Sequence, residues 1–344
     1  MKLKNILSIL CVFFVAMSCS MEDDILKEGS NNVKQDGDTE AYVSFNLSLS
    51  EMTKTQEEPA STNEKAIQNV TLFLLDRDGN VLAVKTAGAN DDYKNVKFLT
   101  KVTNGAYEVL AVVNNNTDLT SKKSKNAINE AALNENDLNA LVKVGSSLVV
   151  FPANFEGSSA LTGVTLPVHY QTIKVHQIAA RIELGTCTVK GFTAGLSDVN
   201  VSLVNVQLSN INKVSYVDKD ADQGHSYKED NKSLNVTLWE NGQSAGNGIT
   251  NKNKPVFYSF RNTNGTPIEM SLTFQVGNNT PKTRTFIING PNSKTGADHN
   301  YVKAGYLYRL NVTVNVQGED VEPTFTCSVL DWDRNFITGD LEQN

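Results

Sequence analysis

The chain has 344 residues, of which 31 are Lys or Arg and 38 are Asp or Glu, so its formal net charge is −7 and its pI is about 5.3. A mildly acidic chain of this kind lacks the basic surface that binding to nucleic acid requires, and we therefore expect no nucleic-acid partner. Apolar residues make up 40% of the sequence, which is enough for real cores, and the length suits two domains of ordinary size.

The first 19 residues have the features of an export signal. Two lysines precede an apolar run, residues 6–15, which is too short to span a bilayer as a helix. Small or flexible residues then lead to Cys19, and an acidic stretch follows it. This arrangement resembles a bacterial lipoprotein signal, in which residues 1–19 form the signal peptide and Cys19 carries acyl chains such as palmitate that hold the precursor at the outer membrane. The alternative is an ordinary signal peptide with a chance cysteine.

The next segments read as a tether, a strand and an exposed loop. Residues 20–39 are polar and acidic, whereas residues 41–49 alternate strictly between apolar and polar side chains, as a half-buried strand does. Residues 50–65 are polar and carry a proline, so we expect them to be exposed. Lys54 in this loop could be cut by a trypsin-like protease, although any exposed lysine would look the same. The apolar positions of the strand include Val43, Phe45, Leu47 and Leu49.

The rest of the chain is dominated by strand-like runs separated by polar loops. The best helix candidate is residues 128–142, and a long apolar strand is expected at residues 173–184. We place the domain boundary near that strand, which gives an N-terminal domain at 55–178 and a C-terminal domain at 179–344. Short strands at this spacing predict a mostly β protein built of β-sandwich domains in tandem, with a short helix in the first. Further strands are expected at 70–75, 81–84, 105–113, 148–151, 164–168, 199–208, 234–238, 256–260, 270–276, 285–288, 306–316 and 324–332.

The sequence offers little chemistry for catalysis. Its four histidines are accompanied by no HExxH, GxSxG or Walker motif, so we expect neither an enzyme nor a cofactor. Cys187 and Cys327 lie in strand-like runs and are interpreted as buried thiols. One segment has the carboxylate spacing of a calcium loop, but Gln223 stands where the tight turn needs glycine, and an acidic hairpin loop without a functional metal is the preferred interpretation. The carboxylates of this candidate are Asp218, Asp220, Asp222 and Glu229.

Several segments, taken in order, resemble a known family. They are the leader to Cys19, the alternating strand with Lys54 after it, GAYEVLAVVN at 105–114, VHQIAARIEL at 175–184, and YRLNVTV with FTCSVLDW near the C-terminus. In this order and spacing the chain resembles the type V fimbrillins of the Bacteroidia, the FimA-like major fimbrial subunits. The resemblance implies two tandem transthyretin-like β-sandwich domains and a structural subunit of an adhesive cell-surface fimbria.

The resemblance also implies how the subunit would mature and polymerise. A protease that cuts after Lys54, leaving Thr55 as the first residue, would remove the propeptide, residues 20–54, with its strand at 41–49. The opened groove would take a C-terminal strand, within residues 324–344, from another subunit, so the partners are other copies in a homopolymer. A strand that leaves exposes unpaired backbone groups, and its replacement must alternate in the same way. The expected anchors of the donor strand are Phe325, Cys327, Val329 and Trp332.

Two other functions stay open at this point. The chain could be a tip or anchor subunit of the same fibre, or a monomeric surface lipoprotein that binds glycan or a host protein through Trp239, Tyr258 and nearby loops. A receptor on a host or bacterial surface is a further possible partner in each case.

Overall fold

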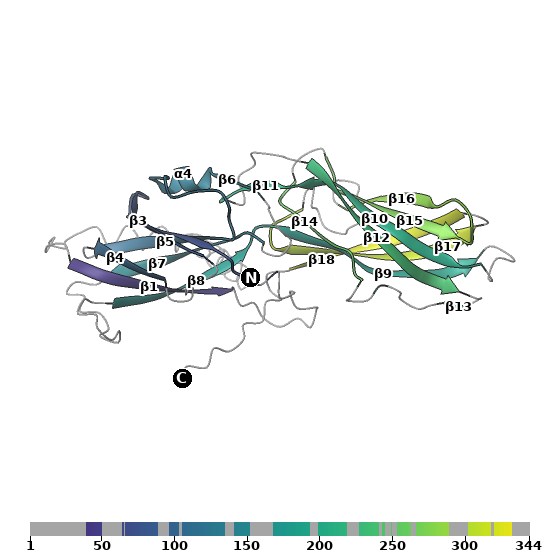
Figure 1. The fold of residues 1–344 in the computed structure, drawn as a ribbon, viewed down its shortest axis with the longest axis horizontal. Coiled ribbons are helices and arrows are strands. Elements are labelled where there is room, and N and C mark those ends of the chain that lie inside the picture. The colour runs from purple at the N-terminus through teal and green to yellow at the C-terminus, as the bar shows by residue number, and fades with distance from the viewer. Residues whose placement is uncertain are drawn as a thin grey trace, which may run out of the picture.

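The structure is a computed structural model, and it consists mostly of β-strands arranged in two halves along the long axis of the molecule (Figure 1). The N-terminal half contains one large sheet, and the C-terminal half contains two sheets packed on each other. The residues that the structure describes are 39–49, 64, 66–88, 96–102, 105–134, 141–151, 168–192, 199–218, 227–240, 243–244, 249, 253–262, 266–288, 302–317 and 320–331.

The N-terminal half is built on a seven-stranded sheet with the order β3-β2-β5-β7-β8-β1-β4. Its two outermost strands, β3 and β4, contact each other, so the sheet curls around an apolar core that includes Leu72, Val109 and Ile173. The strands are β1 (Thr39–Leu49), β2 (Val70–Leu75), β3 (Val81–Ala87), β4 (Val96–Val102), β5 (Gly105–Val113), β7 (Lys143–Phe151) and β8 (Val168–Gln177). The expected strand at residues 41–49 is confirmed as part of β1.

The helix expected at residues 128–142 is wrong in position and length. The helix of this region is α4 (Lys125–Asn129), and the Ser124 side chain caps it by accepting a hydrogen bond from the amide of Ala127 at 3.3 Å. The chain then becomes extended as β6 (Ala132–Asn134). The apolar residues of this stretch are therefore buried by an extended segment rather than by one face of a long helix.

Strand β6 also connects the two halves of the molecule. It pairs antiparallel with β11 (Val214–Tyr216), which comes from the C-terminal half (Figure 1). Beneath this pair lies a second apolar cluster, in which Leu110 and Ile128 of the N-terminal half are buried together with Val217 and Phe260 of the C-terminal half. The two halves thus share packed apolar surface.

The C-terminal half is a β-sandwich. A five-stranded sheet, β13-β12-β10-β15-β16, and a four-stranded sheet, β14-β9-β17-β18, bury their facing side chains in one core. Along β15 every second residue is buried, as the alternation in the sequence predicts. The strands are β9 (Ala180–Phe192), β10 (Val201–Asn212), β12 (Tyr227–Glu240), β13 (Gln243–Ser244), β14 (Val256–Ser259), β15 (Glu269–Val276), β16 (Lys282–Ile287), β17 (Tyr306–Gln317) and β18 (Asp320–Asp331).

The long strand expected at residues 173–184 is divided in the structure. Strand β8 ends at Gln177 in the seven-stranded sheet, and β9 begins at Ala180 in the four-stranded sheet. Ile178 and Ala179 join the two strands, and both are buried in the apolar cluster between the halves. The connection is therefore as apolar as the strands on each side, which is why the sequence shows no break there.

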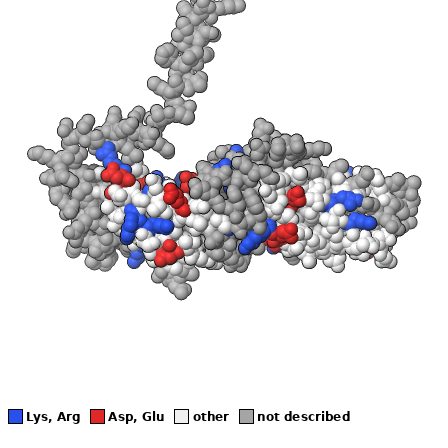
Figure 2. Space-filling view, turned by 90° about the horizontal axis from the view of Figure 1, so that it is seen from above, with Lys and Arg blue, Asp and Glu red and all other residues white. Residues whose placement is uncertain are grey.

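Charged side chains of both signs are interspersed on the described part of the face in Figure 2. Blue and red groups lie close to each other over both halves, and no broad basic stripe is seen on that part of the face.

Candidate functional site

The strand predicted to be removable, β1, occupies an interior place in its sheet. It pairs parallel with β8, with Leu47 opposite Ile173 and Leu49 opposite Val175, and antiparallel with β4 from Thr39↔Val102 onward. Ile173 and Val175 are buried in the core of the N-terminal half. If β1 left, β8 and β4 would lose this partner, and an opening beside the core would form. We call this place the β1 slot.

The segment predicted to be the donor strand is also part of a sheet. Strand β18 pairs antiparallel with β17 along its whole length, from Asp331 opposite Tyr306 to Asp320 opposite Gln317. Residues 324–331 of the predicted donor segment are therefore paired within their own subunit in this structure. Among the described strands, however, β18 is the edge strand of its sheet and pairs with β17 alone.

The first residues of β18 are anchored more firmly than an edge strand requires. Val321 is fully buried in the core of the sandwich, and its carbonyl accepts a hydrogen bond from Arg284 Nε at 3.2 Å. Pro323 follows opposite Val314, at an edge position where a missing N–H does no harm to the sheet. If β18 separates from β17, we therefore expect the residues after Pro323 to separate and those before it to stay in place.

Cys187 and Cys327 belong to the two strands that flank β17. Cys187 of β9 faces Val312 of β17, and Cys327 of β18 faces Leu310. Two strand spacings amount to about 9.5 Å, which is too far for a disulfide. Cys187 is buried as a thiol, as predicted, and its burial raises the pKa to about 12, so it has no nucleophilic thiolate at neutral pH.

A buried cluster of charged side chains, which the sequence analysis missed, joins the two halves. Glu183 of β9 is fully buried and accepts hydrogen bonds from Arg181 Nη2 at 2.6 Å and from Arg309 Nε at 2.5 Å. Lys254 Nζ lies 3.6 Å from the same carboxylate. Arg181 also binds Glu64, which is only 1% exposed although we expected residues 50–65 to be exposed.

The surrounding charges favour the ionised states of Arg181 and Glu183. Burial alone would lower the pKa of Arg181, but Glu64 and Glu183 outweigh it, so the pKa of Arg181 is raised. Burial would likewise raise the pKa of Glu183, but Arg181 and Arg309 outweigh it, so that pKa is lowered. The sequence carried one signal of the cluster, since Arg181 and Glu183 alternate with the apolar residues Ala180, Ile182 and Leu184.

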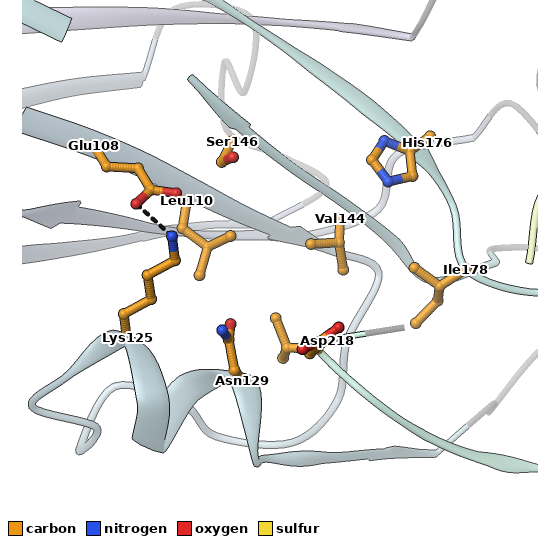
Figure 3. A pocket seen from close by; sticks show the side chains of 10 residues that line it. Glu108, Leu110, Lys125, Asn129, Val144, Ser146, His176, Ile178 and Asp218 are labelled. Atoms are coloured by element: carbon orange, nitrogen blue, oxygen red, sulfur yellow. Dashed lines mark hydrogen bonds and ion pairs between the residues drawn. The ribbon is translucent and has the colours of Figure 1, made fainter. Parts of the chain in front are cut away.

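A shallow cavity of about 280 Å³ lies between the outer face of the N-terminal sheet, α4 and the segment after β11 (Figure 3). Its rim carries an ion pair between Lys125 Nζ and Glu108 Oε2 at 2.7 Å, and Leu110 and Val144 form part of its floor. His176 and Asp218 also line it. The cavity is thus a mixed surface hollow, and its strongest charges already neutralise each other.

The calcium-like segment is described only in part. Asp218 lies at the cavity just described and is exposed, and Glu229 accepts a hydrogen bond from Gln207 Nε2 at 2.8 Å. Asp220 and Asp222 lie outside the described residues, so the calcium hypothesis is not tested. Among the residues that are described, no group of three or more His, Cys, Asp or Glu could hold a metal ion.

Several predicted site residues also lie outside the described part of the chain, namely Cys19, Lys54, Thr55 and Trp332. For Phe325, Cys327 and Val329 of β18, and for Val43, Phe45, Leu47 and Leu49 of β1, the structure gives the strand and its pairing. In the described residues, no helix has the length and apolar character needed to cross a membrane.

Comparison with known families gives a match for the C-terminal half. Residues 178–331 match the family model for the C-terminal domain of the Fim1C-like fimbrium tip subunit. The resemblance to the fimbrillins is confirmed. The match begins between β8 and β9 and ends with the last residue of β18. No curated protein matches the chain.

Solved structures share the fold of this chain over most of its length. A proposed cell adhesion protein from Parabacteroides distasonis is 18% identical, covers 89% of this chain and 99% of its own, and superposes with a TM-score of 0.59. A fimbrilin from Porphyromonas gingivalis is 15% identical, with coverages of 86% and 98% and a TM-score of 0.54. A proposed adhesion protein from Bacteroides eggerthii is 17% identical, with coverages of 88% and 98% and the same TM-score, 0.54.

Proposed function

We propose that this chain is a structural subunit of an adhesive cell-surface fimbria and that it polymerises by exchanging a β-strand between copies. The observation that carries the proposal is the place of β1 between β8 and β4, at the edge of a buried core. This strand comes before the loop with Lys54, so a single cut in that loop severs β1 from the rest of the chain. The fold shared with a fimbrilin and the match to a fimbrial-subunit domain support the same function.

In this proposal the precursor is exported as a lipoprotein and matured at the cell surface. Cys19 is acylated and anchors the precursor in the outer membrane, and a trypsin-like protease then cuts between Lys54 and Thr55. The removed segment takes β1 with it. Because a lysine stands at the cut, the protease need not be specific for arginine.

The donor is the C-terminal segment of a neighbouring copy, residues 324–344. The donor segment has 21 residues and β1 has 11, so the incoming segment is long enough to span the slot. Its apolar positions alternate as those of β1 do, which lets apolar side chains face the core at the register positions opposite Ile173 and Val175. Donation in one direction from copy to copy does not close into a ring and therefore gives a fibre.

The domain organisation that we propose is two transthyretin-like sandwiches in tandem, at residues 55–178 and 179–344. The end of β8 at Gln177, the start of β9 at Ala180 and the first residue of the family match, 178, support a boundary at this place. The slot then belongs to one domain and the donor strand to the other, so each copy is linked to two neighbours.

A tip subunit of the same fibre is the second candidate, and a specific observation favours it. The family model that matches residues 178–331 is named for a tip subunit. Antibody labelling of the fibre separates the two roles, because a stalk subunit is labelled along the fibre and a tip subunit only at its end.

For a monomeric glycan binder, the structure offers less support, since Tyr258 is buried and Trp239 packs on Phe192 with ring centroids 4.6 Å apart.

Treatment of the purified full chain with a trypsin-like protease tests the proposed function. We expect a ladder of polymers that resists heating in detergent, because a strand buried in a neighbour dissociates very slowly. The matched control is Lys54→Gln, which removes the cut and is expected to stay monomeric under the same treatment. A single monomer band from the cleaved wild-type chain would contradict strand exchange and favour a monomeric surface protein.

A further inference from the structure

A short segment just before β2 is bonded to both halves of the molecule. Its first residue, Glu64, is held by the C-terminal half, where Arg181 Nη1 of β9 donates to the two carboxylate oxygens at 2.8 and 3.0 Å. The hydroxyl of Tyr258, in β14, donates to Glu64 Oε1 at 2.5 Å. The Glu64 side chain is 1% exposed, so these are buried, charge-assisted hydrogen bonds rather than a surface ion pair.

The main chain of the same segment is held by the N-terminal half. The carbonyl of Glu64 accepts a hydrogen bond from Gln177 Nε2, at the end of β8, at 2.8 Å. The carbonyl of Ala66 accepts two, from Asn114 Nδ2 at 2.8 Å and from Lys143 Nζ at 3.1 Å. Within three residues, the chain is therefore bonded to both sheets that flank the junction.

Two of these partners, Asn114 and Lys143, have a conformation or an environment that is costly without compensating contacts. Asn114 has a φ of 59°, a left-handed conformation that few residues other than glycine adopt. Its side-chain oxygen accepts from the amide of Gln68 at 2.7 Å, and its amide group also reaches the carbonyl of Leu141 at 2.9 Å. Lys143 is 0% exposed, and a buried ammonium group is costly unless it is hydrogen-bonded. Both residues act on the segment before β2.

We propose that Glu64 and residues 66–69 form a strap that makes the two halves one cooperative unit and marks where the removable N-terminal segment stops. The second part of this proposal rests on the proposed function, and the first part does not. The cut after Lys54 lies ten residues before Glu64, so it releases β1 while the strap keeps its bonds. The slot can then open without loosening β2, which begins at Val70 directly after the strap.

The strap also lies where a fibre would carry its load. In the proposed polymer, one neighbour is held in the β1 slot of the N-terminal half, and the other receives residues 324–344 from the C-terminal half. Tension along the fibre therefore passes through the junction between the halves in every copy. Buried bonds from Arg181 and Tyr258 on one side and from Gln177 and Lys143 on the other cross that junction.

The test compares the uncut full chain with its Glu64→Gln variant by calorimetry and hydrogen exchange. We expect one sharp unfolding transition for the wild type and a broader transition at lower temperature for Glu64→Gln, because the coupling between the halves weakens when the ion pair with Arg181 is lost while the shared apolar cluster remains. The amide of Gln68 should exchange at least about tenfold faster in the variant. The control is Glu229→Gln, which changes an exposed carboxylate hydrogen-bonded to Gln207 and should change neither result.

Tyr258→Phe provides a second variant if Glu64→Gln does not fold, since it removes one hydroxyl and keeps the ring. It should still accelerate exchange at Gln68. Two transitions in the wild type, or unchanged exchange and cooperativity in both variants, would overturn the coupling. After cleavage at Lys54, protection of the Gln68 amide should persist, and its loss would overturn the strap as a stop. A cleaved chain that keeps this protection but forms no polymer would contradict the proposed function alone.

Discussion

Deletion of residues 324–344 is expected to leave a folded monomer that forms no polymer after cleavage at Lys54. The monomer should fold because β18 is an edge strand, and the deletion keeps Val321, which is buried in the core. Polymer should be absent because the donor strand is gone. Each large apolar side chain that the slot buries contributes roughly 1.5–3 kcal/mol to the binding of the donor strand. The loss of several such side chains therefore removes most of the binding free energy. The measurement is the heat-resistant ladder after protease treatment.

A matched pair of point variants in the full chain tests the same strand more finely. Val329→Asp should weaken polymerisation, because it brings an unpaired charge into an apolar slot. Ser328→Asp adds the same charge at the neighbouring position, which belongs to the opposite face of the strand, and should have little effect. Heat-resistant ladders from the deletion variant would show that the donor is not the C-terminal segment.

Replacing Arg181 by methionine is expected to cause the largest loss of stability among single substitutions in the charged cluster. The side chains of Glu64 and Glu183 are 1% and 0% exposed, and Arg181 binds both. Removing one partner of a buried ion pair leaves an uncompensated buried charge, which typically lowers the free energy of unfolding by about 3–5 kcal/mol. Urea denaturation followed by fluorescence measures the change.

The control for this substitution is Lys125→Met. Lys125 makes an equally short ion pair with Glu108, at 2.7 Å, but the two side chains are 41% and 24% exposed. An exposed pair contributes only about 0–1 kcal/mol, so this variant should remain close to the wild type. Equal losses in the two variants would contradict the argument from burial.

The same cluster predicts a dependence of stability on acidity. Because the folded state lowers the pKa of Glu183, its ionised form stabilises the fold above the ordinary glutamate pKa, and this contribution is lost as the pH falls through the lower folded value. In Arg181→Met, one of the two arginines that lower this pKa is absent. The stability difference between wild type and variant should therefore shrink as the solution becomes strongly acidic, and a difference that grows would contradict this account.

Strands in which apolar and polar residues alternate could be predicted from the sequence. The ends of strands could not be predicted where the connecting residues are also apolar and buried. In β17 the buried positions Leu310, Val312, Val314 and Val316 repeat every second residue, and the polar residues between them face outward. Across residues 173–184 there is no such punctuation, because Ile178 and Ala179 at the bend are themselves buried. The predicted helix extends too far toward the C-terminus because apolar residues after α4 are buried in an extended segment. Their spacing in the sequence resembles that of one face of a helix.

The candidate site likewise has one part that could be predicted from the sequence and one part that could not. The alternation of residues 41–49 and the loop around Lys54 pointed to a strand that could leave, and β1 lies between β8 and β4. Glu64 could not be predicted, because it stands in a polar stretch and its partners Arg181 and Tyr258 are more than a hundred residues away in the sequence. A single charged residue shows no periodicity that would reveal its burial.

The N-terminus of the protein in fibres sheared from the cell surface tests the central claim most directly. Mass spectrometry of that material identifies the first residue without any assumption about the donor strand. Removal of β1 after Lys54 predicts Thr55 as the first residue, with no peptide from residues 39–49 in the fibres. A surface protein that still begins at acylated Cys19 and retains those residues would contradict the account.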